Sequence, residues 1–221
     1  MQDGCNNFCS YCIVPYARGR SRSRRLESII NEIQEVMKQG KKEIVITGIH
    51  IASYKQMSEV GSQKSEIVLI DLLEEIDKIE GLEKFELGSL EPTLITEEFV
   101  ERLKRLEKLR NHFHLSLQSG CDKILKSMNR KYTTSEFEKA TKLLRDNLTD
   151  VVLTTDIIVG FPGETDEDFE ETYMFLKKIN FNDMHVFKFS PRKGTPAAKM
   201  QEQVDERIKE ERSKRLIESS N

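Results

Sequence analysis

Three cysteines lie within eight residues near the start of the sequence. Cys5, Cys9 and Cys12 have the spacing C-x3-C-x2-C, and the chain has one further cysteine, Cys121. Soft thiolate ligands clustered in this way select zinc or an iron–sulfur cluster. A closed structural zinc site needs four protein ligands, usually as two separated pairs, and no second pair follows here. Three cysteines in one short loop can instead hold a four-iron cluster and leave one iron open for chemistry.

Two other interpretations of these thiols stay open. In the first, Cys121 or a histidine completes a zinc site, and the chain is a zinc-stabilised binding module without turnover. In the second, the cysteines are free, or two of them form a disulfide and one is spare. Cytosolic chains seldom place cysteines so close together without a metal or redox reason, which argues against the second interpretation.

The composition is typical of an ordinary soluble α/β protein. It has 221 residues, of which 37% are hydrophobic and 33% charged, enough for one large domain or two small ones. No run approaches the ~20 apolar residues of a membrane span, and no apolar signal segment stands at the N-terminus. We therefore expect a cytoplasmic protein with no membrane partner.

Local charge differs from the overall balance. The net charge of −3 argues against a globally basic nucleic-acid binder. Five arginines nevertheless follow the cysteines within eight residues, and arginine clusters recognise phosphate or carboxylate groups. The alternative is the solvated start of a basic helix. The five are Arg18, Arg20, Arg22, Arg24 and Arg25.

The rest of the chain alternates apolar strands with amphipathic helices, which predicts parallel βαβ units. Residues 58–65 are expected to form a polar connection. Helices are predicted at 26–37, 67–79, 96–109, 122–128, 135–145 and 204–217. Strands are predicted at 43–48, 84–90, 112–118, 151–159 and 184–190, with a stub at 1–3.

Three of these strands alternate polar and apolar residues, so each is expected to carry one polar face. Strands of an ordinary packed parallel barrel are apolar on both faces, so polar side chains on three strands suggest a ligand-lined interior. The alternative for each is a satisfied buried polar group or an exposed edge. The polar sets are His112, His114, Ser116 and Gln118; Thr154 and Asp156; and Lys188 and Ser190, opposite Phe187 and Phe189.

Five strands and a stub fall short of the eight strands of a complete TIM barrel. We predict an α/β fold, an open three-quarter (β/α)6 barrel of parallel strands. Active sites of such folds lie at the carboxyl ends of the strands, and the cysteine loop directly follows the first strand.

The cysteine spacing, with the aromatic Tyr11 just before the last cysteine, resembles the signature of radical S-adenosylmethionine (SAM) enzymes. This resemblance implies that Cys5, Cys9 and Cys12 hold a [4Fe–4S] cluster whose open iron binds the amino and carboxylate groups of SAM. It also implies a reducing electron donor, because one-electron reduction cleaves SAM to a 5′-deoxyadenosyl radical.

Further stretches resemble the methylthiotransferase branch of that family, and some resemble its members that act on threonylcarbamoyladenosine 37 in tRNA. The implied reaction is methylthiolation at C2 of that base. The isopentenyladenosine-tRNA and ribosomal-protein branches are alternatives. The resemblance to the branch is carried by residues 2–5, 13–20, 116–120, 156–165 and 189–197, and the resemblance to the tRNA threonylcarbamoyladenosine enzymes by 17–24, 47–54, 118–122 and 128–133. In this interpretation Cys121 belongs to a subfamily motif and is not a cluster ligand.

The resemblance, together with strand position, assigns expected roles to the remaining site residues. No side chain is expected to act as an acid or base on carbon, because the C2 hydrogen is not acidic and the cofactor performs the difficult step. The expected contacts are Tyr11 with the adenine of SAM, Gln118 and Asp156 with its ribose, Gly48 and His50 beside its methionine end, Lys188 facing its carboxylate, and Arg18 and Arg20 with that carboxylate or with the tRNA backbone.

Family members also carry an N-terminal domain with a second cluster and a small C-terminal RNA-binding barrel. We therefore expect residues 1–200 to be a radical SAM core with a truncated first strand. Residues 201–221 are expected to be a helix leading to a missing RNA-binding domain. Such a fragment is expected to be unable to complete methylthio transfer alone.

Overall fold

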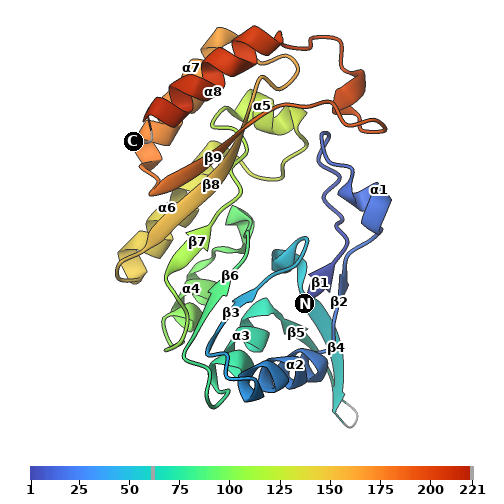
Figure 1. Ribbon diagram of the computed structural model, residues 1–221, viewed down its shortest axis with the longest axis vertical. Coiled ribbons are helices and arrows are strands. Elements are labelled where there is room, and N and C mark those ends of the chain that lie inside the picture. Colours follow the sequence, from blue (N-terminus) through green and yellow to red (C-terminus); the bar gives the residue numbers. More distant parts are fainter. Residues whose placement is uncertain (61–62, 220–221) are drawn as a thin grey trace.

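The computed structural model describes residues 1–60 and 63–219 and shows a curved, half-open barrel of parallel strands with helices on its outside (Figure 1). Six parallel strands form the barrel, which confirms the predicted partial α/β barrel. They are β1 (Gln2–Asp3), β3 (Glu43–Ile46), β6 (Lys84–Leu87), β7 (His112–His114), β8 (Val152–Val159) and β9 (Asp183–Lys188).

The strands follow one another in chain order around the curve. β3 pairs with β6, and β7, β8 and β9 form a three-stranded parallel sheet. Single bridges join the remaining neighbours: Gln2 to Gly48 links β1 to the end of β3, and Leu90 to Leu115 links the segments after β6 and β7. β1 and β9 are thus the two edges of an open barrel.

Helices α2 (Leu26–Lys38), α3 (Leu69–Asp77), α6 (Thr134–Asn147) and α7 (Asp166–Ile179) cover the outer face because each buries apolar residues at helical spacing. Thr96, Thr133 and Thr165 start three helices by accepting a hydrogen bond from the backbone three residues ahead. In the described part of the chain no helix has the length and apolar composition needed to cross a bilayer. The other helices are α1 (Val14–Arg18), α4 (Glu97–Leu103), α5 (Asp122–Ser127) and α8 (Glu206–Ser219), with 3-10 turns η1 (Ile51–Ser53), η2 (Pro92–Leu94) and η3 (Ala197–Lys199).

β8 shows how the barrel separates its two faces. Leu153 and Ile157 are fully buried against the helices, whereas Thr154 and Asp156 lie half-buried on the inner face. His112 and His114 of β7 share that inner face, because both imidazoles lie within 3.2 Å of the Thr154 hydroxyl. The predicted polar inner faces of these two strands are confirmed.

The prediction for β9 is wrong in one respect. Paired residues on neighbouring strands point to the same side, and β8 pairs Asp156 with His185 and Ile158 with Phe187. His185 and Phe187 therefore face inward. Lys188 turns to the outer side, where its Nζ lies 2.8 Å from the carboxylate of Glu210 on α8.

Two smaller strand pairs extend the fold beside β1. β2 (Arg22–Ser23) runs antiparallel to β1, and β4 (Lys55–Val60) and β5 (Gln63–Val68) form an antiparallel hairpin. The sequence predicts a polar connection at 58–65, of which residues 61–62 lie outside the described residues. The hairpin lacks the apolar alternation that marks a half-buried strand, so periodicity does not indicate it.

The C-terminal helix α8 packs on β8, β9 and α7 as an outer helix of the barrel (Figure 1). Its Arg212 is buried and pairs with the buried carboxylate of Glu164 at 2.6 Å, and with Asp166 at 2.7 Å. Burial raises the pKa of Glu164, and the guanidinium of Arg212 opposes that rise. This pair fastens α8 to the turn that follows β8.

Replacing Arg212 by alanine leaves the Glu164 carboxylate buried without its cation. We expect the free energy of unfolding to fall by about 3–5 kcal/mol, as for other broken buried pairs. Urea denaturation followed by circular dichroism measures the change. Arg215→Ala on the same helix is the matched control, because its partner Glu170 is exposed and solvent screens such a pair, so its loss should be clearly smaller. Equal losses in the two variants would contradict the assigned role of the Arg212–Glu164 pair.

Candidate active site at the cysteine loop

The loop that carries Cys5, Cys9 and Cys12 runs from β1 to α1, on the edge of the barrel where the strands end (Figure 1). It also contacts the opposite edge of the barrel. Ser10 accepts a hydrogen bond from the Ala197 backbone at 2.8 Å and donates from its own backbone to Met128 at 2.9 Å. The Asn129 side chain donates to the Phe8 carbonyl at 2.9 Å. The loop is thereby held at a fixed position across the opening of the barrel.

The three thiols are free, with Cys9 buried and the other two half-buried. Three thiols are one short of the four ligands of a closed structural zinc site. Burial raises the pKa of Cys5 and Cys12, so metal ligation must release their protons. The donor set therefore fits an iron–sulfur cluster with one open iron.

Cys121 lies apart from the loop cysteines. It is buried in a small apolar cluster with Ile124, Met128 and Phe161, and its thiol lies 3.6 Å from Asp168. Burial raises the pKa of Cys121 to about 11. The fold thus does not bring Cys121 to the loop as a fourth zinc ligand.

A buried arginine contacts the central cysteine. One nitrogen of Arg130 lies 3.3 Å from the Cys9 sulfur, a second lies 2.9 Å from Glu91, and its Nε donates to the Tyr132 hydroxyl at 2.9 Å. The Tyr132 hydroxyl in turn shares its one hydrogen between the backbone carbonyls of Ser116 and Leu117, which follow β7. The cation is therefore fixed between the cysteine loop and two strand ends.

Glu91 is the centre of this network. Besides Arg130 it accepts a hydrogen bond from the Asn7 side chain at 2.7 Å, and its second oxygen lies 3.0 Å from His50 Nε2. Burial alone would raise the pKa of Glu91, but His50, Arg130 and Asn7 together hold it below its ordinary value. The carboxylate thus stays charged and ties the cysteine loop to the segments after β3 and β6.

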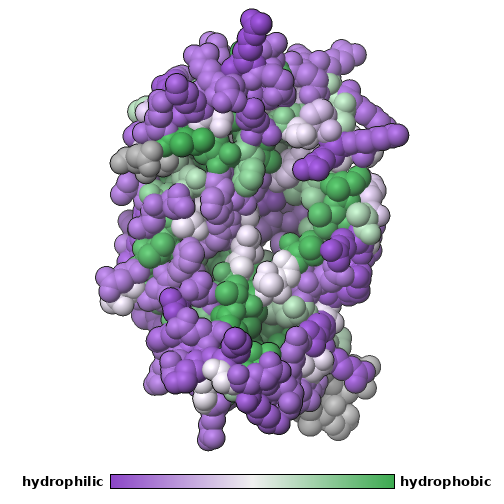
Figure 2. All heavy atoms as spheres, in the orientation of Figure 1, coloured by the Kyte–Doolittle hydropathy of each residue, from purple (hydrophilic) through white to green (hydrophobic). Residues whose placement is uncertain are grey.

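Four of the residues predicted to contact SAM line one pocket of about 250 Å³ beside the cysteine loop. Tyr11, Gln118, Asp156 and Lys188 contribute to its wall. Burial raises the pKa of the Tyr11 phenol well above its ordinary value. The remaining wall consists of Ile158, Phe187, Phe189, Ser190 and Arg192. In the space-filling view the molecule is hollowed near its centre (Figure 2).

Backbone geometry explains two of the predicted positions. Gln118 has a φ of +71°, which is uncommon for a residue with a side chain, and it is held there by hydrogen bonds to Asp156 and Ile158 of β8. A Cβ on Gly48 would lie 2.7 Å from the Gln2 carbonyl, so glycine lets the ends of β1 and β3 approach. His50 follows, and its backbone donates to the Gln2 side chain at 2.7 Å.

The other predicted residues lie toward the edge of the site. The Arg20 guanidinium lies 4.8 Å from the centre of the Phe8 ring, and the largely exposed Arg18 lies 3.9 Å from Asp3. Lys188 reaches the pocket wall, but its nitrogen is directed to α8, so its placement does not support the predicted contact with a carboxylate. Both carboxylate oxygens of Asp156 have an imidazole neighbour, with which a ribose hydroxyl would have to compete.

The network of Glu91, Arg130 and Tyr132 was not predicted. The sequence gives one indication of it: Glu91 directly follows the predicted strand 84–90, just as His50 follows the predicted strand 43–48. Arg130 comes from a loop after α5, and only the folded chain places it on Cys9.

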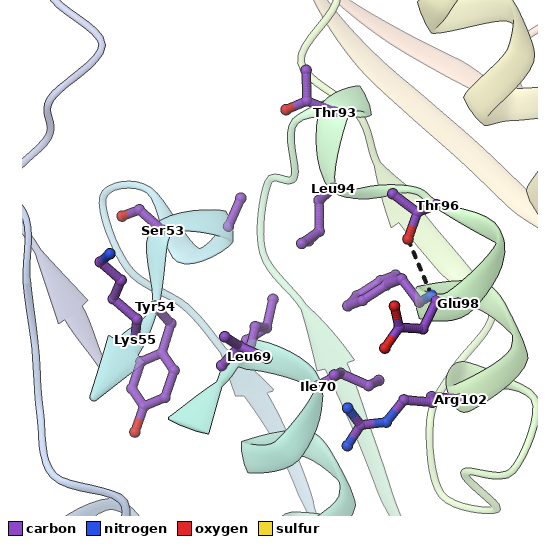
Figure 3. Close-up of a pocket in the computed structure, with 13 residues that line it drawn as sticks. Ser53, Tyr54, Lys55, Leu69, Ile70, Thr93, Leu94, Thr96, Glu98 and Arg102 are labelled. Carbon is purple, nitrogen blue, oxygen red and sulfur yellow. Dashed lines mark hydrogen bonds between the residues drawn. The ribbon is translucent and has the colours of Figure 1, made fainter. Parts of the chain in front are cut away.

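A second pocket, of about 340 Å³, lies outside the barrel opening (Figure 3). Its walls come from η1, from the end of β5 and the start of α3, and from η2 and α4. Tyr54, Leu69, Leu94 and Arg102 are among its lining residues. None of the residues predicted for cluster, SAM or RNA contacts lines this pocket.

Comparison with known proteins agrees with this geometry. The model of the Radical SAM superfamily matches residues 1–176. The chain is 46% identical over 98% of its length to the threonylcarbamoyladenosine tRNA methylthiotransferase MtaB of Bacillus subtilis, and covers 47% of that protein. It is 44% identical over 99% of its length to a tRNA-2-methylthio-N(6)-dimethylallyladenosine synthase of Acetivibrio thermocellus, and covers 44% of it. The chain thus spans about half the length of these relatives.

Solved structures show the same fold at low sequence identity. The radical SAM methyltransferase TsrM of Kitasatospora setae, solved with cobalamin and a [4Fe-4S] cluster, superposes with a TM-score of 0.71 at 19% identity, over 89% of this chain and 37% of that one. Coproporphyrinogen III oxidase of Escherichia coli superposes with a TM-score of 0.68 at 13% identity, over 98% of this chain and 50% of that one.

Replacing Glu91 by alanine should leave the Arg130 cation buried without its carboxylate. We expect a loss of about 3–5 kcal/mol in the free energy of unfolding, measured by urea denaturation. Glu97→Ala, at an exposed position in the first turn of α4, is the control and should cost at most about 1 kcal/mol. If Glu91→Ala unfolds no more easily than this control, the network does not hold the cysteine loop.

Proposed function

This chain belongs to the radical SAM superfamily, and we propose that it is the catalytic core of a tRNA methylthiotransferase that acts at C2 of N6-threonylcarbamoyladenosine 37. The observation that carries the proposal is the trio of free thiols fixed at the carboxyl ends of the strands, within a chain similar over nearly its whole length to two tRNA methylthiolation enzymes. The activity of the complete protein, its tRNA partner and a cytoplasmic location are parts of this proposal.

The cofactors are those of the superfamily, a [4Fe–4S] cluster and SAM. Cys5, Cys9 and Cys12 would hold the cluster, and the cluster with SAM would supply one-electron chemistry at a C–H bond that is not acidic. A guanidinium nitrogen of Arg130 lies 3.3 Å from the Cys9 sulfur, so this cation would stand beside the cluster. The electron comes from a separate reducing protein or small reductant.

The residues of the pocket position SAM and the base. Tyr11 and Gln118 line its wall, and burial keeps the Tyr11 phenol in its neutral form as a flat surface for an adenine ring. His50 presents a buried Nδ1 without a hydrogen-bond partner at the end of β3, where the methionine end of SAM is proposed to lie. No side chain is assigned a proton transfer at C2, because that hydrogen is not acidic.

Arg18 and Arg20 are proposed to contact the tRNA backbone. Both are exposed at the edge of the cysteine loop, where a guanidinium can reach a phosphate without losing a buried partner. Domains beyond this core, as expected from the family, would supply the remaining RNA contacts and the second cluster.

Dimethylallyladenosine in tRNA is the second candidate substrate, because the Acetivibrio thermocellus relative is named for it. The resemblance of residues 17–24 and 47–54 to the threonylcarbamoyladenosine enzymes supports the first candidate. Both relatives are named for tRNA, which favours tRNA over a ribosomal protein as the substrate.

Anaerobic reconstitution with iron and sulfide tests the cofactor assignment. The chain should turn brown with broad visible absorbance and bind about four irons, as a [4Fe–4S] cluster requires. Cys9→Ala should abolish the colour, whereas the control Cys121→Ala should keep it, since Cys121 lies outside the loop. Stoichiometric zinc and no colour would favour the zinc-stabilised binding module.

Deletion of the complete gene in its host tests the substrate. Nucleosides of hydrolysed tRNA, analysed by mass spectrometry, should lose the methylthio group on threonylcarbamoyladenosine and keep it on dimethylallyladenosine. The intact gene should restore the modification, and a gene with Cys9→Ala should not. The opposite pattern of loss would assign the chain to the dimethylallyladenosine branch.

A further inference from the structure

Three potential metal ligands from adjacent strands meet on the inner face of the barrel, apart from the cysteines. His114 of β7, Asp156 of β8 and His185 of β9 place their ligand atoms all within 4.8 Å of one another. His114 Nε2 lies 3.2 Å from one oxygen of Asp156, and His185 Nδ1 lies 3.2 Å from the other. The parallel pairing of the three strands fixes this convergence, because Asp156 and His185 occupy paired positions.

The Nε2 atom of His114 is the observation that points to a ligand. This nitrogen is buried and faces the Asp156 carboxylate at 3.2 Å, so an ion between the two groups would be ligated by both. Its other nitrogen, Nδ1, lies 3.0 Å from the Thr154 hydroxyl. A histidine that binds a metal commonly has this arrangement, with one nitrogen held by a neighbouring polar group and the other presented to the ion.

The cluster is open on one side. The His114 side chain is 15% exposed, Asp156 28% and His185 59%. The two imidazoles lie nearly parallel, with ring centres 5.8 Å apart, and the carboxylate is close to both. Asp156 also lines the pocket shared with Tyr11 and Gln118. An ion held here would therefore keep open coordination positions on the pocket side.

We propose that His114, Asp156 and His185 form a second metal site of this chain, for a divalent cation of the zinc class. Ligands on one such ion lie about 3 Å apart, since each bond is ~2.0–2.2 Å long, and the observed separations of 3.2 Å match this spacing. Two imidazoles and one carboxylate suit zinc, iron(II), cobalt or nickel, whereas magnesium and calcium prefer oxygen ligands alone.

The site is chemically distinct from the cysteine loop. Its donors are nitrogen and oxygen, whereas the loop offers sulfur only, so the two sites select different ions. With three protein ligands, the ion binds a further oxygen or nitrogen ligand from the pocket, in the manner of open zinc sites. The proposal does not depend on which tRNA base the complete protein modifies.

Zinc binding to the chain with its iron–sulfur cluster assembled tests the proposal, because the loop cysteines are then occupied. Anaerobic calorimetry should show one zinc per chain, and X-ray absorption at the zinc edge should show nitrogen and oxygen neighbours at about 2.0–2.2 Å and no sulfur at about 2.3 Å. His114→Gln and His185→Gln should each weaken binding more than the ~10- to 100-fold that loss of an outer partner costs.

His112→Gln is the matched control. His112 lies on the same face of β7 as His114 and contacts the same Thr154 hydroxyl. It is not one of the three proposed ligands, so its replacement should leave the zinc affinity unchanged. Circular dichroism and iron content show that each variant is folded and carries its cluster. Sulfur ligation, equal binding by His185→Gln, or no zinc binding by the unaltered chain would each overturn the proposal.

Discussion

The guanidinium of Arg130 is only 6% exposed and contacts Cys9, Glu91 and Tyr132 at the same time. Removing an arginine and a glutamate from water costs several kcal/mol for each charge, and their attraction offsets that cost only when the geometry is well satisfied. The Glu91 carboxylate meets this condition, because Asn7 and His50 contact it in addition to Arg130. This buried charge network, together with the backbone hydrogen bonds of Ser10, holds the cysteine loop in place.

The network also explains why the site can form in an open barrel. β1, which precedes the loop, has only two residues and joins β3 through a single bridge, so strand pairing alone would leave the cysteines loosely placed. Glu91 and Arg130 connect them to the ends of β6 and β7, and Ser10 connects them to Met128 and Ala197 on the opposite edge. The opening of the barrel is thus spanned by a loop fixed at both of its sides.

Local patterns predicted much of the fold and part of the site. Alternation identified the inner face of β7 and β8 because polar and apolar residues there follow the period of a strand. Lys188 was misplaced because Phe187, which is 52% exposed, was assigned to the buried face. An aromatic side chain can line a pocket, as Phe187 does, and Glu210 on α8 attracts Lys188 to the outer side. The sequence of the strand alone shows neither of these contacts. Arg130 and Glu91 are far apart in the chain, so only tertiary folding creates their contact.

The account depends on one iron that the three cysteines leave free to bind SAM. Electron paramagnetic resonance and electron–nuclear double resonance of the reduced, cluster-loaded chain address this directly, with SAM labelled by ¹⁵N at its amino group and ¹⁷O at its carboxylate. The account predicts that SAM changes the cluster signal and that couplings to both labels appear. An unchanged spectrum with no coupling to either label, at saturating SAM, would contradict it.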